Sequence, residues 1–349
     1  MSVATSKSGG GLRGILASLV QTNEQKAAVL LAAVTVLYGF KSADKVKAKR
    51  LEEMEKAKRT GKAQRAPTAE KIQDHPVFSW LFMNTSIWAV AAAKNLAIGD
   101  LKKGDSVPKV FLKMMVSSVV TVDFLTLWHV IVINHVYKHI PFFSDKRRPR
   151  TLFEVAKDYA TCNFVANTIM TLPQAFAFVK KEDVGHKQGP WRPLRFVGRL
   201  MWFRVAIDIF FWLGHRVLHM KGVYAKNHRT HHEDNCTQLT TNFHFDWWDL
   251  VIEAFLPFLG AAASYEALIG PIDQFDISLL GSYLFWHEME SHAGKPLPTM
   301  ALIGPLSTWT QQFDDYNTWF HELHHRILKA NYSITPWIDV VLGTIRWEL

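Results

Sequence analysis

The sequence predicts an all-α, polytopic membrane protein with about four transmembrane helices plus re-entrant or interfacial helices. Apolar stretches of 15 to 21 residues recur along the chain, and most are long enough for a membrane helix. The mean hydropathy is near zero although 20% of the residues are charged, which indicates that apolar segments alternate with basic polar ones. The 13 Trp and 23 Phe residues suit a protein whose aromatic side chains line membrane interfaces.

Residues 1–75 are predicted to form an N-terminal unit before the main domain. Residues 1–26 contain Glu24 as their only acidic residue and are expected to be a disordered tail rather than a transit-like leader. The apolar run 27–40 has 14 residues, which is short for a bilayer crossing, so it is either an interfacial helix or a marginal anchor. Residues 41–71 carry 11 Lys and Arg residues and are predicted to be a cytoplasmic helix, because positive charge is retained on that side.

Residues 76–349 are predicted to form the membrane-embedded domain. Its candidate spans are the apolar segments 76–93, 114–133, 159–179 and 200–214. If all four cross, the cytoplasmic helix at 41–71 places the basic stretch 146–150 in the cytoplasm and brings His215 out on the same side. The basic loop at 180–199 is then luminal, which runs against the same rule.

Two further apolar stretches, 250–269 and 272–286, are predicted to form a hairpin that dips into the membrane. Ionisable residues are costly in a bilayer, and three of them argue against a full crossing here: Glu253, Glu266 and Asp276. The hairpin returns His287 to the face on which His215 emerges.

Histidine is concentrated in one part of the chain. Eleven of the 16 histidines fall between His215 and His325, and ten of these form four clusters: His215 and His219; His228, His231 and His232; His287 and His292; His321, His324 and His325. On a helix, residues three or four apart share a face, so each HxxHH cluster can offer a fork of imidazole donors. Ten imidazoles are more than one ion can use, which predicts a two-metal centre of iron or zinc.

Several other features bound the function. The net charge of +9 suits an anionic membrane surface, and no nucleic-acid-binding motif accompanies it, so nucleic acid is not an expected partner. The two cysteines, Cys162 and Cys236, do not make a disulfide framework. Asp208 lies seven residues before His215 on the same predicted helix face; it either orients a ligand imidazole or pairs with Arg204.

The motifs resemble the fatty acid hydroxylase/sterol desaturase superfamily of membrane-bound non-haem di-iron oxygenases. The resemblance covers residues 208–344, the predicted catalytic region. Its blocks are, in order, Asp208, Trp212, His215-Arg216 and His219; His228-x-x-His231-His232; His292-Ala293-Gly294 with Pro296; His321-x-x-His324-His325; and Asn331-Tyr332, Trp337, Asp339 and Leu342-Gly343-Thr344. Their order and spacing together are specific, although any one block alone is weak.

The resemblance implies a cytosolic, histidine-rich helical cap above the membrane helices, in the endoplasmic reticulum. It implies two Fe ions, with zinc possible in the isolated protein, and the following ligands: His215, His219, His228, His231, His232, His292, His321, His324 and His325, with His287 as the tenth. One block departs from the family. Where many members have His-Pro-x-Glu or His-Pro-x-Asp, this chain reads Asn242-Phe243-His244-Phe245-Asp246, so His244 is a ligand, a group behind the ligands or part of a pocket wall.

The implied reaction is an O2-dependent hydroxylation or desaturation of a lipid, either a sterol or a fatty acyl or sphingoid chain. The His-Pro-Gly-Gly of a fused haem domain is absent, so the electrons are expected from an external donor such as cytochrome b5 with its NAD(P)H reductase. The lipid would reach the metals through an apolar channel, for which the aromatic candidates are Trp247, Trp248, Phe285, Trp286 and Trp319.

Two rival functions remain open at this point. His321-Glu322-Leu323-His324-His325 also satisfies HExxH, the pattern of zinc hydrolases in which Glu322 is the general base. That class needs about three protein ligands and leaves the other histidine clusters idle; in a di-iron protein Glu322 lies behind the ligands or faces solvent. The third possibility is a non-catalytic metal-binding membrane protein, which depends on neither O2 nor reductant.

Overall fold

The computed structural model describes residues 76–98, 101–102, 104–136, 138, 142–180, 192–272, 274–295 and 317–346. The predictions for residues 1–75 lie outside this part. The described residues are helical and contain no strand, as the sequence predicts. The long helices are α3 (Pro76–Ile98), α4 (Val107–Ile131), α5 (Leu152–Lys180), α6 (Arg192–Leu218), α9 (Leu256–Leu268) and α10 (Gln274–Ser291).

Shorter elements connect the long helices and complete the fold. They are α7 (Tyr224–Asn227), α8 (Trp247–Asp249), α12 (Asn317–Ile327) and α13 (Pro336–Leu342), the 3₁₀ turns η3 (His231–Glu233) and η4 (Leu239–Phe243), and the π-helical turns η2 (Val132–Val136) and η5 (Leu250–Phe255). The apolar segments expected at 76–93, 159–179 and 200–214 lie within α3, α5 and α6, and the segment 114–133 runs from α4 into η2.

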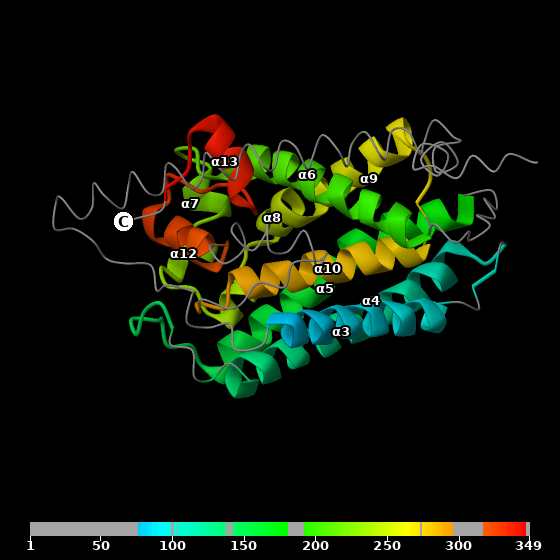
Figure 1. The fold of residues 1–349 in the computed structure, drawn as a ribbon, viewed down its shortest axis with the longest axis horizontal. Helices are drawn as coiled ribbons and strands as arrows, with labels where there is room; N and C mark the ends of the chain where they lie inside the picture. Colours follow the sequence, from blue (N-terminus) through cyan, green and yellow to red (C-terminus); the bar gives the residue numbers. More distant parts are fainter. Residues whose placement is uncertain are drawn as a thin grey trace, which may run out of the picture.

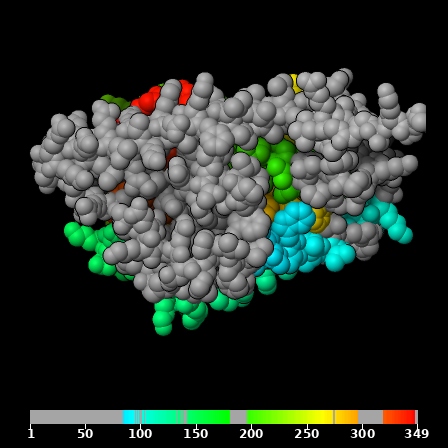
Figure 2. Space-filling model, in the orientation of Figure 1, coloured from blue at the N-terminus to red at the C-terminus, as the bar shows by residue number. Residues whose placement is uncertain are grey.

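The long helices form an elongated bundle (Figure 1). Helix α3 packs between α10 and α4, α4 packs on α5, and α6 packs along α9. The short elements α7, α12 and α13 gather at one end of this bundle, on the left in Figure 1, and α8 lies further toward the middle. Figure 2 shows the same face in space-filling form, with α3 (cyan) at its surface. The residues of the histidine clusters therefore come from elements at one end of the bundle.

The core lies where α3, α6, α9 and α10 meet. Its fully buried side chains include Phe203, Leu279 and Leu280. Helices α6 and α9 approach closely because Gly260 faces the ring of Phe210, where a Cβ atom would lie only 2.8 Å from the ring. This close packing positions the carboxyl end of α6, which carries His215.

An exposed apolar stripe along α4 fits contact with lipid. It consists of Leu112, Val116, Val120, Phe124, Leu127 and Ile131. At 1.5 Å per residue its 19 steps span roughly 29 Å, close to the ~30 Å hydrocarbon core of a bilayer. By length and composition, two helical stretches of the described part are able to cross a membrane: Val107–His135 and Trp247–Leu268. The second contains most of 250–269, the first arm of the hairpin that is predicted to dip into the membrane, and the prediction of about four crossings stays a prediction.

Candidate metal centre

Nine of the ten predicted ligands come together in two groups of ring nitrogens. Within each group the candidate ligand atoms lie within 4.8 Å of one another. Site A is defined as His215, His219, His228, His232 and His324, and site B as His231, His292, His321 and His325. All of them are buried except His219, which is half-buried. Each HxxHH cluster is divided between the two sites, whereas the sequence suggests a fork that serves one ion.

The five Nε2 atoms of site A form a closed ring. Neighbouring atoms are 3.0–3.2 Å apart in the order His215, His228, His232, His324 and His219. Two nitrogens bound to one ion at about 2.1 Å and at right angles are separated by about 3.0 Å. The ring therefore has the spacing that neighbouring ligands of a single ion require.

Site B is smaller and adjoins site A. The Nε2 atom of His292 lies 3.3 Å from that of His231 and 2.8 Å from that of His321, and His321 lies 3.2 Å from His325. The rings of His232 and His325 have centroids 4.5 Å apart, so the two sites share a wall. This arrangement of neutral donors fits a pair of first-row transition-metal ions.

Nδ1 contacts behind the ligands orient most of these imidazoles. In five ligands Nδ1 contacts a backbone carbonyl: His215 contacts Tyr332 (2.7 Å), His324 contacts Ala330 (2.7 Å), His325 contacts Asp234 (3.0 Å), His292 contacts Glu288 (2.9 Å) and His231 contacts His244 (3.3 Å). In the sixth, His228, Nδ1 contacts the side-chain carboxylate of Asp249 at 2.9 Å. A proton on Nδ1 leaves the Nε2 lone pair free to face the centre, which is the arrangement that metal-bound histidines show.

Burial keeps these imidazoles uncharged. It lowers the pKa of His292 and of His324 to about 4, and it lowers the pKa of His231, His232 and His325 well below the ordinary value of 6.5. Neighbouring imidazoles lower the pKa of the last three further. Because only neutral imidazole can bind a metal, the apo site is ready to accept ions at neutral pH.

A buried carboxylate, Asp339 of α13, holds the loop that orients two of the ligands. It accepts hydrogen bonds from the backbone N–H groups of Tyr332 (3.0 Å) and Ser333 (2.8 Å), and from the indole of Trp212 on α6 (3.3 Å). The carbonyls of Ala330 and Tyr332 belong to this loop. The sequence places Asp339 in a motif but gives no sign of this role.

Asp208 and Glu322 have structural partners. Asp208 accepts a hydrogen bond from the backbone N–H of Thr335 at 3.0 Å and thus anchors the start of α13. Glu322, which is 1% exposed, accepts hydrogen bonds from the backbone and hydroxyl of Thr237 at 2.7 and 2.5 Å and from Nε of Arg326 at 2.9 Å. These bonds fasten α12 to the segment after η3, a poor arrangement for a general base.

His287 and His244 lie outside both sites. His287 is half-buried on α10, and its ring hydrogen-bonds the backbone of Ile334. The ring of His244 lies in a charged cluster, with Nδ1 2.6 Å from Asp158 and Nε2 3.3 Å from Glu233. His244 reaches the centre only through its carbonyl, which the ring of His231 contacts. Of the three roles left open for His244, the structure thus favours a supporting one.

Two carboxylates beside site A were not predicted as site residues. Asp249 contacts His228, as described above, and Oε1 of Glu253 lies 3.4 Å from Nε2 of His215. The sequence signal was that Glu253 lies inside the apolar segment 250–269 and Asp249 directly before it, since a carboxylate in such a segment is costly without a partner.

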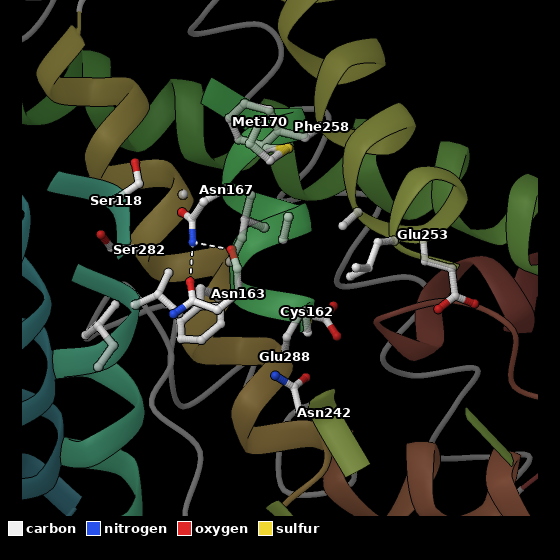
Figure 3. A pocket seen from close by; sticks show the side chains of 18 of the residues that line it. Ser118, Cys162, Asn163, Asn167, Met170, Asn242, Glu253, Phe258, Ser282 and Glu288 are labelled. Carbon is white, nitrogen blue, oxygen red and sulfur yellow. Dashed lines mark hydrogen bonds between the residues drawn. The ribbon is translucent and has the colours of Figure 1, made fainter. Parts of the chain in front are cut away.

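A mostly apolar cavity of about 240 Å³ reaches site B (Figure 3). Three ligands of site B contribute to its wall: His231, His292 and His321. The cavity runs between α4, α5, α9 and α10 for at least ~17 Å, since Ile277 and Glu288 of α10 both line it, eleven residues apart. In Figure 3, Glu253 lies on one side and Ser118 and Ser282 on the other.

The expectation for the aromatic lining is correct at one position. Phe285 lines the cavity, together with Phe243 and Phe258. Trp247 and Trp248 stack on each other with centroids 3.9 Å apart and are about half exposed, so they face outward instead. Trp286 and Trp319 are buried elsewhere in the described structure.

Fold and site together define a class: a helical protein with an exposed apolar helix face and two groups of buried histidines, one of which ends an apolar cavity. Residues 200–344 match the model of the family described as fatty acid hydroxylase. This confirms the resemblance indicated by the motifs: residues 200–344 are similar to the fatty acid hydroxylase domain.

Curated relatives agree with this assignment. The chain is 28% identical over 159 residues to methylsterol monooxygenase 2-1 of Arabidopsis thaliana, a match that covers 42% of this chain and 54% of the relative. It is 30% identical over 154 residues to the very-long-chain aldehyde decarbonylase GL1-8 of Oryza sativa subsp. indica, covering 42% and 52%. The chain thus spans about half the length of these relatives. No solved structure matches the chain.

Proposed function

We propose that this protein catalyses the O2-dependent hydroxylation or desaturation of a lipid at a histidine-ligated di-iron centre. The observation that carries the proposal is the grouping of nine Nε2 atoms into two adjoining sites, one of which faces an apolar cavity. The names of the relatives, a methylsterol monooxygenase and a very-long-chain aldehyde decarbonylase, support a sterol or a long-chain lipid as the substrate class.

The residues present fit the implied metals. The nitrogen spacing, the Nδ1 contacts and the lowered pKa values all favour neutral imidazoles that face a cation. Iron bound there would supply the oxygen chemistry that side chains cannot perform. In this proposal the nine histidines of sites A and B are the ligands, and His287 is left out.

The chain's own contribution is to place and isolate one carbon of the substrate. A lipid in the cavity would lie with one part against His231, His292 and His321, while the apolar walls between α5 and α10 exclude water. Holding a reactant in a fixed position removes much of the entropy cost of reaction. The electrons for the reaction would come from an external donor such as cytochrome b5. The metal centre would face the cytosol at the endoplasmic reticulum membrane.

The geometry disfavours the zinc hydrolase. Its general base would have to be Glu322, whose carboxylate is engaged by Thr237 and Arg326. His321 and His325 also share site B with two further histidines, which exceeds the usual ligand set of a catalytic zinc.

The test is a mass comparison of total lipids from cells that express wild type, His324→Ala or the control His135→Ala. His135 is an exposed histidine outside both sites. Cells receive iron and a cytochrome b5 donor. A lipid that gains one oxygen or loses two hydrogens with wild type and His135→Ala, but not with His324→Ala, supports the proposal. An unchanged lipid profile in spite of two bound ions would refute it and favour the hydrolase or the metal-binding scaffold.

A further inference from the structure

The helix that covers site A carries a local irregularity. Between α8 and α9 the chain forms the π-helical turn η5, which contains Glu253. Such turns are rare and occur frequently at functional sites, because the extra residue in the turn redirects side chains. Glu253 is turned inward here, and its side chain is 9% exposed.

The Glu253 carboxylate faces the ring of imidazoles. Oε1 lies 3.4 Å from Nε2 of His215 and 3.6 Å from Nδ1 of His228. Among the described residues Oε1 has no hydrogen-bond partner. A buried, ionised carboxylate oxygen without a partner is strongly unfavourable unless the group takes up a proton or a cation lies beside it.

The neighbouring carboxylate differs in this respect. Asp249 contacts the His228 ring at 2.9 Å and caps its own helix turn by accepting from the backbone N–H of Asp246 at 3.3 Å. Asp249 therefore has a structural role, because it orients the ligand His228. Oε1 of Glu253 makes no hydrogen bond that would give Glu253 a similar role.

We propose that Glu253 is the sixth ligand of the ion in site A and its one anionic donor, an inference that rests on the two-metal centre proposed above. Five neutral imidazoles leave one position of a six-coordinate shell open and bring no negative charge to a divalent ion. The 3.4 Å from Oε1 to Nε2 of His215 is close to the roughly 3.0 Å expected for adjacent ligands. In the metal-free structure the carboxylate is grouped with His228 and Asp249 and not with all five nitrogens of site A, so it has to turn toward the ion when the ion binds.

This assignment makes the two sites unequal. Glu253 lines the cavity, as do three histidines of site B, but no histidine of site A does. The carboxylate therefore lies between the cavity and the ion of site A. Site B, with four protein ligands, is the site left open toward the substrate.

The test uses the full-length protein in detergent, with ferrous iron under anaerobic conditions as the probe. Glu253→Gln keeps the shape of the side chain and removes its charge. The matched control is Glu266→Gln on α9, a carboxylate that accepts a hydrogen bond from Ile272 at 3.4 Å and lies outside both sites. Metal per chain and affinity are measured by competition with a chelator, and thermal unfolding is measured with and without iron.

In Glu253→Gln, we expect one of the two ions to bind about 10–100-fold more weakly, by analogy with the loss of other groups that tune a metal site. The second ion and the Glu266→Gln control remain as in wild type. The metal-free variant unfolds at the same or a higher temperature, because a buried unpaired carboxylate is gone. The stabilisation that iron confers is smaller.

Two outcomes would overturn the assignment. Wild-type affinity for both ions in Glu253→Gln would show that the carboxylate is not a ligand. A lower unfolding temperature of the metal-free variant, with unchanged iron affinity, would show a structural role. If wild type itself binds fewer than two ions, the two-metal centre fails as well; if it binds two and lipids are unchanged, only the proposed reaction fails.

Discussion

Replacing Gly294 by alanine tests how tightly the loop after α10 fixes site B. Gly294 has a φ of +66°, and a Cβ atom there would lie 2.1 Å from the carbonyl oxygen of Thr237. Cβ atoms in proteins essentially never come closer than 3.0 Å to such an atom, so one of the two segments must move by at least 0.9 Å (3.0 − 2.1).

Either movement reaches site B. Gly294 follows the proposed ligand His292 by two residues, so a shift of its backbone displaces that imidazole. Thr237 donates its N–H to Glu322 of α12 at 2.7 Å, and α12 carries two other ligands of site B. Metal–ligand distances tolerate deviations of only about 0.2 Å. We therefore expect Gly294→Ala to lose the ion of site B.

Gly222→Ala is the matched control. Gly222 has a φ of +89°, but a Cβ atom there would have no neighbour within 4 Å. Both substitutions carry the cost of a left-handed residue, about 1–2 kcal/mol. Only Gly294→Ala adds the clash, and overpacking typically costs about 1–3 kcal/mol more. Elemental analysis gives the metal per chain and calorimetry the unfolding temperature; equal values for the two variants would refute the reasoning.

Three further predictions address the rival function, the cavity and the charge state of the ligands. Glu322→Gln should lower the unfolding temperature, since each hydrogen bond to a charged group contributes about 1.5–3 kcal/mol. It should leave the metal content and part of the lipid oxidation intact. Complete loss of activity in a folded, metal-loaded variant would favour the hydrolase. Gly281→Leu adds a side chain inside the cavity where a Cβ atom meets nothing within 4 Å. It should reduce lipid turnover by about tenfold or more at unchanged metal content, and an unaltered rate would place the substrate elsewhere. In the metal-free protein, the pKa values of His292 and His324 are about 4, below the 6.5 of the unfolded chain. The unfolded state then binds more protons between these values, so stability should fall as pH drops from 6.5 to 4, by about 1.4 kcal/mol per pH unit for each such group; denaturant titrations that show no fall in this window would contradict it.

The helices and their approximate limits could be predicted from the sequence because apolar runs of this length have few alternatives. The segment 159–179, for example, lies within α5, whose ends extend seven residues earlier and one residue later. Helix ends depend on local contacts that hydropathy does not contain, such as the hydrogen bond from the N–H of Thr151 to Glu154 at 2.7 Å. The number of membrane crossings is likewise not fixed by hydropathy alone.

The sequence by itself determined which histidines lie together on one helix face. His321 and His325 are four residues apart on α12, so the helix places both in the same site. His228 and His232 also share a site, but they lie in a turn and in the 3₁₀ turn η3, so helical spacing does not bring them together. The number of clustered histidines also favoured a two-metal centre, since ten imidazoles exceed what one ion can bind.

Only the tertiary structure decided how the clusters are shared. His324 joins site A although its neighbour His325 joins site B, because successive residues of α12 point in different directions and each reaches a different one of the two adjoining sites. The same packing sets His287 apart from both sites and turns Glu253 toward His215. These outcomes depend on contacts between residues tens of positions apart, which no local pattern in the chain specifies.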